Sequence, residues 1–124
     1  AHAWTRIIET GDQSRMRQAA RAVIEGDLVE RSFERLIHKD QNIAYEAYAL
    51  TALLVKAGET APIYKTLGEH KDEDVKLALL HVLQTIRSEA TFDSLSELLT
   101  RHELTPNVAA KVNEVRSYSQ LMNV

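Results

Sequence analysis

Three histidines recur at a spacing that could hold a metal ion. His38, His70 and His102 are evenly spaced along the sequence, so in a stack of repeats of that period they would lie along one edge. Neighbouring helices pack about 10 Å apart, whereas a zinc–nitrogen bond is about 2 Å long. One ion could not join two such histidines, and we interpret them as helix-end residues that complement the helix dipole. We predict no metal and no cofactor.

Catalytic patterns are absent from the sequence. His81 falls in the middle of an expected helix, and the sequence places no nucleophile or orienting carboxylate beside it. There is no His-Glu-x-x-His motif, no glycine-rich phosphate loop and no Gly-x-Ser-x-Gly turn. Glu30 and Glu34 are one helical turn apart, but Arg31 and Arg35 follow them, as on a solvated, salt-bridged face. We predict no catalytic residues and favour a protein that is not an enzyme.

One small basic cluster could contact phosphate groups. It comprises Arg15, Arg17 and Arg21, of which the last two share a helix face. The whole chain, however, has 15 Lys+Arg against 18 Asp+Glu and a net charge of -3. A nucleic-acid-binding domain usually carries a basic excess, so we expect this face to be solvated and paired with nearby acids.

Helices must position these residues, because apolar residues recur at steps of three and four along the chain. The 124 residues include only four glycines and two prolines, too few for the turns of a β-sheet protein. No cysteine is present, so neither a disulfide nor a zinc–thiolate site can hold the fold together. The predicted helices span residues 2–10, 13–25, 28–38, 41–57, 60–68, 73–87, 91–102 and 106–121.

Residues that favour helix ends support these boundaries. Glycines are expected to close four helices in a left-handed conformation: Gly11, Gly26, Gly58 and Gly68. Side-chain oxygens are expected to accept hydrogen bonds from the first backbone N–H groups of six helices: those of Asp12, Asp27, Asp40, Asp72, Thr91 and Thr105.

An internal repeat organises the chain. The segment 38–43 aligns with 70–75, and the apolar stripe that follows aligns at the same offset. The matching residues are Ile43, Ala47, Leu50 and Leu54 in the first copy, and Val75, Leu79, Val82 and Ile86 in the second. A third copy, shifted by one residue, contains Val108, Val112 and Val115. A period of this length, made of one long and one short helix, is typical of an α-solenoid; an up-and-down helical bundle is the alternative.

The repeat resembles a known family. Residues 72–83 are similar to the first helix of a HEAT repeat, with an acidic turn, then Val75 followed by Lys76, then Ala78 and leucines. Residues 88–100 are similar to the second helix of that repeat. The resemblance implies an all-α, right-handed solenoid of about three and a half repeats and eight helices, forming one domain over residues 1–124. The chain does not begin with Met, so it is compatible with a fragment of a longer protein.

HEAT repeats define a scaffold and not a chemistry, so the resemblance implies a binding function. We expect non-catalytic binding of a partner protein or peptide on the concave face formed by the second helices. The residues expected to bind it are Glu30, Arg31, Glu34, Arg35, Lys65, Glu97 and, near the N-terminus, Trp4. This mixed charge suits a protein partner better than a phosphate backbone, which requires a dense row of Lys and Arg.

Two other functional classes stay open. One is a HEAT-like enzyme or enzyme subunit, by analogy with lyases or DNA glycosylases built on such scaffolds; the other is a nucleic-acid-binding module using the segment from Arg15 to Arg21. We expect no membrane span, because the longest apolar stretch, Ala47 to Val55, is half the necessary length. The absence of cysteine suits a cytoplasmic location. Tyr45 and Tyr48, one turn apart, are interpreted as packing between helices.

Overall fold

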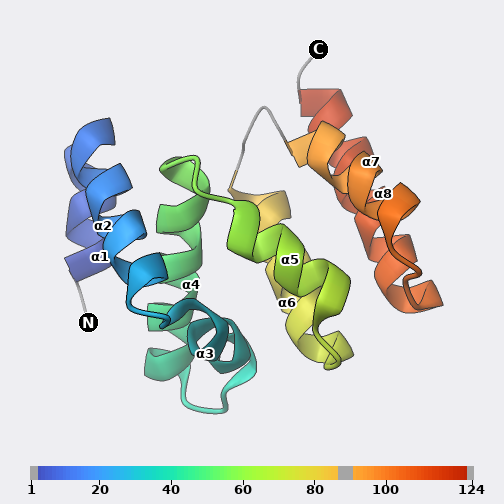
Figure 1. The fold of residues 1–124 in the computed structure, drawn as a ribbon, viewed down its shortest axis with the longest axis horizontal. Helices are drawn as coiled ribbons and strands as arrows, with labels where there is room; N and C mark the ends of the chain where they lie inside the picture. Colours follow the sequence, from blue (N-terminus) through green and yellow to red (C-terminus); the bar gives the residue numbers. More distant parts are fainter. Residues whose placement is uncertain (1–2, 87–90, 123–124) are drawn as a thin grey trace. The chain divides into compact units, whose positions relative to one another are not determined.

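All regular secondary structure in the described part of the chain is helical. The computed structural model describes the backbone of residues 3–86 and 91–122 and the side chains of residues 6–86 and 91–118. Within these ranges it contains eight α-helices, one short 3-10 helix and no strand (Figure 1). The predicted all-α class is therefore confirmed. The chain divides into two compact units, residues 1–62 and 63–124.

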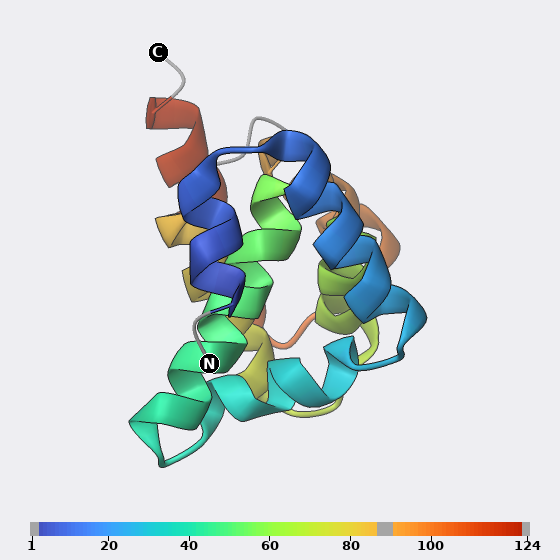
Figure 2. The same ribbon diagram turned by 90° about the vertical axis from the view of Figure 1, so that its left-hand side faces the viewer.

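The first unit is built around its longest helix, α4 (Gln41–Lys56). Helix α4 contacts every other element of the unit: α1 (Ala3–Thr10), α2 (Gln13–Glu25), α3 (Val29–Glu34) and the 3-10 helix η1 (Arg35–Ile37). Helices α1 and α2 lie beside α4, whereas α3 crosses near its N-terminal end (Figures 1 and 2). The C-terminal half of α4 must be enclosed on all sides, because every residue from Ala49 to Val55 is buried.

The second unit is built around α8 (Pro106–Met122). Helix α8 packs against both α6 (Glu73–Thr85) and α7 (Thr91–Arg101), and α5 (Ala61–Glu69) begins at the division between the units. Leucines and valines from these helices form the core of the unit and are buried almost completely: Leu67, Leu79, Leu80, Leu95, Val108, Val112 and Val115.

The apolar stripes of the internal repeat face the cores, as the periodicity predicted. In α8 all three valines of the stripe are fully buried. The stripe of α4 is buried except for its first member, Ile43, which is half-buried. The stripe that follows α6 is buried except for its last member, Ile86, which lies just after the helix and is half-buried. Leu53 and Leu83 lie outside the stripe and are also buried. Both long helices therefore bury more than one face. For this reason their apolar residues are not confined to one side of the helix in the sequence pattern.

The repeat extends to the hydrogen bonds at the start of two long helices. The Nδ1 atom of His38 accepts a bond from the backbone N–H of Asp40 at 2.9 Å, and the Asp40 carboxylate accepts one from the N–H of Asn42 at 2.9 Å. The same two bonds, both 2.9 Å, occur at the equivalent residues of the next copy, His70, Asp72 and Asp74. These histidines thus support the entry of the following helix, whereas the sequence analysis assigned them to the end of the preceding one.

The turn between α2 and α3 differs from the prediction at two residues. Gly26 has an ordinary φ of -78°, and Asp27 takes the left-handed conformation with φ of +58°. The N–H groups of Asp27 and Leu28 donate to the carbonyls of Ile24 and Val23, at 3.1 and 3.3 Å. This Schellman arrangement requires its left-handed residue at position 27, one residue later than expected. Asp27 does not cap α3; Leu28 occupies that position without a side-chain cap.

Most other helix ends follow the prediction. Gly11 and Gly58 have φ of +67° and +76°. Asp12, Asp40 and Asp72 accept bonds from backbone N–H groups at the starts of α2, α4 and α6. The Thr105 hydroxyl accepts a long bond of 3.5 Å from the N–H of Val108. The prediction for Thr91 is wrong, because Thr91 is the first residue of α7 and its buried hydroxyl caps no N–H group among the described residues.

Gly68 does not end a helix but lies inside α5. A Cβ atom at this position would be 2.6 Å from the imidazole ring of His102, which follows the end of α7. A side chain at position 68 therefore requires the His102 ring to move, and no left-handed conformation is involved.

The substitution Gly68→Ala tests this contact. Alanine should stabilise a helix interior by about 1 kcal/mol relative to glycine, but here its methyl group must displace the ring. We expect Gly68→Ala to destabilise the wild-type protein and to stabilise the His102→Ala variant, with a coupling of about 1–2 kcal/mol. Chemical denaturation of the four proteins measures it. An equal effect of Gly68→Ala in both backgrounds would show that the ring does not restrict the site.

Candidate partner-binding site

The charged residues predicted to bind a partner in the first unit lie on two short, consecutive elements. Glu30, Arg31 and Glu34 are exposed on α3, and Arg35 is exposed at the start of η1. A helix of six residues is too short to be stable alone. It is held in place by its opposite side, where Val29 and Phe33 are buried and the helix contacts α4.

The other predicted binding residues lie elsewhere. Lys65 on α5 and Glu97 on α7 are exposed and belong to the second unit. Glu97 forms an ion pair of 2.7 Å with Arg101 on the same helix. Trp4 falls within the backbone range of α1, but its side chain lies outside the described residues.

A small hollow lies within the first unit, beside the charged face of α3. Its volume is about 120 Å³, and α2, α3, η1 and α4 all contribute to its wall. Buried apolar residues line its inner part: Val23, Ala47 and Leu50. More exposed residues line its rim: Leu28, Ser32, Arg35, Ile43 and Glu46. The hollow therefore has a mixed lining, with buried apolar side chains behind a polar and charged rim.

Backbone hydrogen bonds hold Leu28 at this rim. The turn that follows α2 places Leu28 next to Val23, the residue whose carbonyl accepts the Leu28 N–H. The Leu28 carbonyl in turn accepts bonds from the N–H and the hydroxyl of Ser32, at 3.2 and 3.0 Å. The side chain of Leu28 is nevertheless 54% exposed. A fixed backbone thus presents an uncovered aliphatic group at the rim of the hollow.

The two charged residues of the rim differ in their availability. Arg35 forms no ion pair or side-chain hydrogen bond with any residue that the structure describes, and its side chain is exposed. Glu46 already takes part in another interaction. The rim therefore carries one positive charge, on Arg35, and one negative charge, on Glu46.

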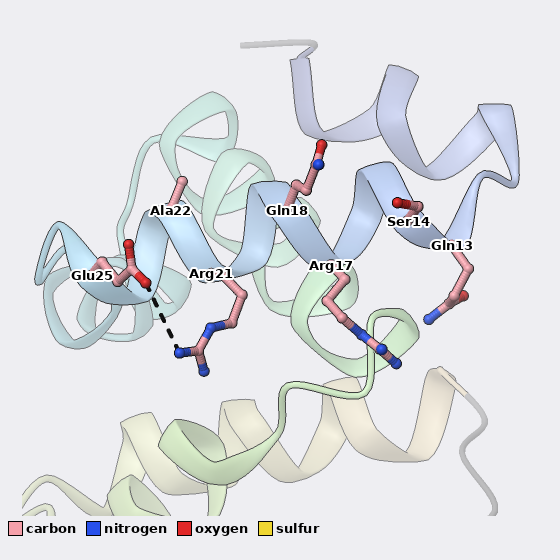
Figure 3. Close-up of a pocket in the computed structure, with 7 residues that line it drawn as sticks. All are labelled: Gln13, Ser14, Arg17, Gln18, Arg21, Ala22 and Glu25. Carbon is pink, nitrogen blue, oxygen red and sulfur yellow. Dashed lines mark ion pairs between the residues drawn. The ribbon is translucent and has the colours of Figure 1, made fainter.

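The basic cluster of α2 is largely neutralised, as the sequence analysis expected. A broad open hollow of about 600 Å³ borders this helix, and Arg17 and Arg21 project on the same side of it as Gln13 (Figure 3). Arg21 lies 3.9 Å from Glu25 and 3.6 Å from Glu59. Arg15 pairs with Asp12 at 3.7 Å. Among the described side chains no carboxylate pairs with Arg17, which leaves one free cation, too little for a phosphate-binding surface.

Tyr45 and Tyr48 stack on each other on α4, with ring centroids 6.5 Å apart and an interplanar angle of 24°. The sequence analysis expected the Tyr45 ring to be packed between helices. Tyr45 is instead 50% exposed, so its ring is not enclosed. Residues two apart on a helix lie about 200° from each other, so Tyr45 lies on the opposite side of α4 from Ile43 and the hollow.

Sequence reasoning selected Arg35 but missed the rest of the hollow. Ile43 was assigned to the core stripe, and Leu28 was taken as the first residue of a helix. A signal for Leu28 exists, because an apolar residue just after a Schellman turn usually contacts the third residue from the helix end. Here that residue is Val23. Finding it required knowing that the left-handed residue is Asp27.

Burial perturbs one ionisable group in the second unit. It raises the pKa of the Tyr64 phenol, and the hydroxyls of Thr91 and Ser94 on α7 offset this in part. The Thr91 hydroxyl is buried and has no partner of full hydrogen-bond geometry among the described residues. Tyr64 has neither a base nor a carboxylate among these neighbours, and we assign it a packing role.

Comparison of the chain with protein-family models, curated proteins and solved structures finds no match. In the described residues, no helix is both long enough and apolar enough to cross a lipid bilayer.

The environment of Tyr64 predicts a dependence of stability on pH. Because folding raises the pKa of this phenol above the ordinary value of about 10, the stability it contributes is complete below that pH. It is lost as the pH rises through the pKa of the folded state. The difference in unfolding free energy between wild type and Tyr64→Phe should thus be constant from pH 7 to 9 and shrink above pH 10.

Urea denaturation across this range measures the difference, with Tyr118→Phe on α8 as a control for loss of an exposed phenol. An unchanged difference between pH 8 and pH 11 would contradict the assigned burial.

Proposed function

We propose that the chain is a non-catalytic protein-binding module with the architecture of a right-handed, HEAT-like solenoid. The internal repeat supports this proposal, because equivalent residues of its copies are buried in the same pattern. The hydrogen bonds that His38 forms also recur at His70, the equivalent residue of the next copy. The alternation of the long helices α4, α6 and α8 with the shorter α3, α5 and α7 supports it as well. In solenoids, successive helix pairs bury their stripes against their neighbours and leave one face available for a partner.

The partner would bind on the face that carries α3 and η1. The observation that carries this proposal is the hollow between α2, α3 and α4, where exposed Leu28 lies beside a rim of mixed charge. Binding energy in protein interfaces concentrates where a side chain fills such a pocket, with polar residues around it. The mixed charges of Glu30, Arg31, Glu34 and Arg35 would form the polar surroundings. Lys65 and Glu97 in the second unit stay predicted binding residues.

The other functional classes receive less support. A DNA- or RNA-binding module would need a cationic row, and two of the three arginines on α2 lie beside carboxylates. An enzyme would need a cleft with a perturbed acid or base, and the one group with a resolved pKa shift in the described residues is Tyr64. A cytoplasmic location stays a prediction from the absence of cysteine.

Affinity capture with matched charge-reversal variants tests the proposed function. The immobilised chain is incubated with nuclease-treated and untreated lysates of its source cells, and bound protein and nucleic acid are quantified. We compare wild type, Arg31→Glu/Arg35→Glu on the α3 side, and Arg17→Glu/Arg21→Glu on α2. Each variant introduces the same change in net charge, and all four arginines are exposed.

We expect a protein captured in stoichiometric amount by wild type and by the α2 variant, and lost with the α3 variant, with or without nuclease. Circular dichroism and thermal melting establish that both variants are folded. Capture of nucleic acid alone, lost with the α2 variant, would overturn the proposal in favour of nucleic-acid binding.

A further inference from the structure

We propose that His38 is a proton-sensitive latch: its neutral imidazole ties the end of η1 to the start of α4, and protonation of the ring releases this tie. The inference goes beyond the proposed function and does not depend on it, because it concerns the chain without a partner.

Three consecutive hydrogen bonds connect η1 to α4. The backbone N–H of His38 donates to the carbonyl of Arg35 at 3.0 Å. The Nδ1 atom of His38 accepts from the N–H of Asp40 at 2.9 Å, and the Asp40 carboxylate accepts from the N–H of Asn42 at 2.9 Å. The first bond closes η1, and the last one caps α4. The imidazole is therefore the middle link between the two elements.

The middle link exists only while the imidazole is neutral. A ring nitrogen accepts a hydrogen bond through its lone pair, so the proton of the neutral ring is on Nε2. In an imidazolium both nitrogens are donors, and Nδ1 would then direct a hydrogen at the N–H of Asp40. Histidine ordinarily changes its charge between about pH 5 and 8, and the His38 side chain is exposed to solvent. The link is thus present with the neutral ring and is lost as the pH falls through its titration.

The geometry is that of a common turn with an uncommon acceptor. Asparagine and aspartate often accept a hydrogen bond from the N–H two residues further on, and Nδ1 of histidine is attached to Cγ just as their side-chain oxygen is. A histidine makes this turn with an acceptor that titrates in mild acid, whereas an amide oxygen does not. The same bond, also 2.9 Å long, recurs at His70. His70 takes part in a further interaction, so the inference is restricted to His38.

The charged groups around His38 do not compensate for the lost link. Those of α3, η1, the turn and the first half of α4 are Glu30, Arg31, Glu34, Arg35, Lys39, Asp40 and Glu46. His38 forms no ion pair with any residue that the structure describes. A cation at the N-terminal end of α4 is also disfavoured by the helix dipole, which is positive there. Asp40 is the carboxylate nearest in the chain to an imidazolium at position 38, so its charge is tested separately below.

The release is expected to be local. Helix α3 is anchored by buried Val29 and Phe33, and these contacts do not involve the imidazole. The element η1 has three residues, none of which is buried, so its attachment to α4 depends more strongly on the latch. Protonation of His38 should therefore loosen η1 and the first turn of α4 without unfolding the unit.

Nitrogen-15 NMR of the whole chain at pH 8 and pH 5 tests the inference. One readout is the scalar coupling across the hydrogen bond between Nδ1 of His38 and the amide nitrogen of Asp40. The other is the protection factor, corrected for the intrinsic effect of pH on exchange, of the amides of Asp40, Asn42 and Ala44, the last of which donates to the Asp40 carbonyl. We expect the coupling at pH 8 and not at pH 5. Protection should fall about fivefold, the contribution of one ordinary hydrogen bond.

Four variants separate the latch from other effects of pH. His38→Asn can make the same turn and cannot be protonated, so its amides should be equally protected at both pH values. His38→Ala should show the low protection at both. Asp40→Asn keeps an N-cap residue of equal quality and removes the carboxylate, so the release should persist. His81→Gln is the matched control, because it removes an exposed histidine from the middle of α6 and should leave the response of the wild type unchanged.

Three results would each overturn the inference. The first is the absence of the coupling at pH 8. The second is equal protection of the wild type at pH 8 and pH 5, as expected if an ion pair with Asp40 replaced the lost bond. The third is an undiminished pH response in His38→Asn. Failure of the chain to capture a protein would refute the proposed function and leave these readouts unaffected.

Discussion

Burial of the apolar stripes on the long helices is the constraint on which the rest of this structure depends. Each stripe is a row of aliphatic side chains at helical spacing, and water disfavours its exposure by about 25 cal/mol for each Å². Helix α4 buries all residues from Ala49 to Val55, so it can exist only when other elements enclose it. Helices α1 and α3 have eight and six residues, and helices this short are marginal in isolation. They are stable because they pack on α4, and α3 thereby acquires a defined surface.

Polar interactions then orient helices that burial alone would leave free to slide. In the second unit, the guanidinium of Arg116 on α8 lies 5.0 Å from the centre of the Phe92 ring and donates from Nε to the Ser96 hydroxyl at 3.0 Å. Lys111 on the same helix donates to Gln84 of α6 at 2.9 Å and pairs with Glu114 at 2.6 Å. These contacts fix the rotation of α8 against both of its neighbours, which the uniform valines of its stripe would specify only weakly.

The features that the sequence predicts well are those governed by local rules. The helix boundaries follow from apolar periodicity and from capping by Asp12, Asp40 and Asp72, because a cap involves residues only two or three apart. The failures have two causes: a contact distant in sequence, and a local turn that two adjacent residues could each form. Gly68 on α5 is explained by the ring of His102, which lies beyond the end of α7, and the left-handed Asp27 by competition between two adjacent candidates for one turn. The hollow joins residues of three helices and η1, so only Arg35, already selected for its charge, could be named in advance.

Native-state hydrogen exchange measures most directly whether the buried stripes carry the stability of both units. Amides that open only when a whole unit unfolds exchange at a rate set by its full free energy of unfolding, whereas those of marginal elements exchange faster. This account predicts the strongest protection at Leu53 and Leu54 in the first unit and at Leu80 and Val112 in the second, with weaker protection along α3. Equal protection of α3 and α4, or fast exchange at the buried valines of α8, would contradict it.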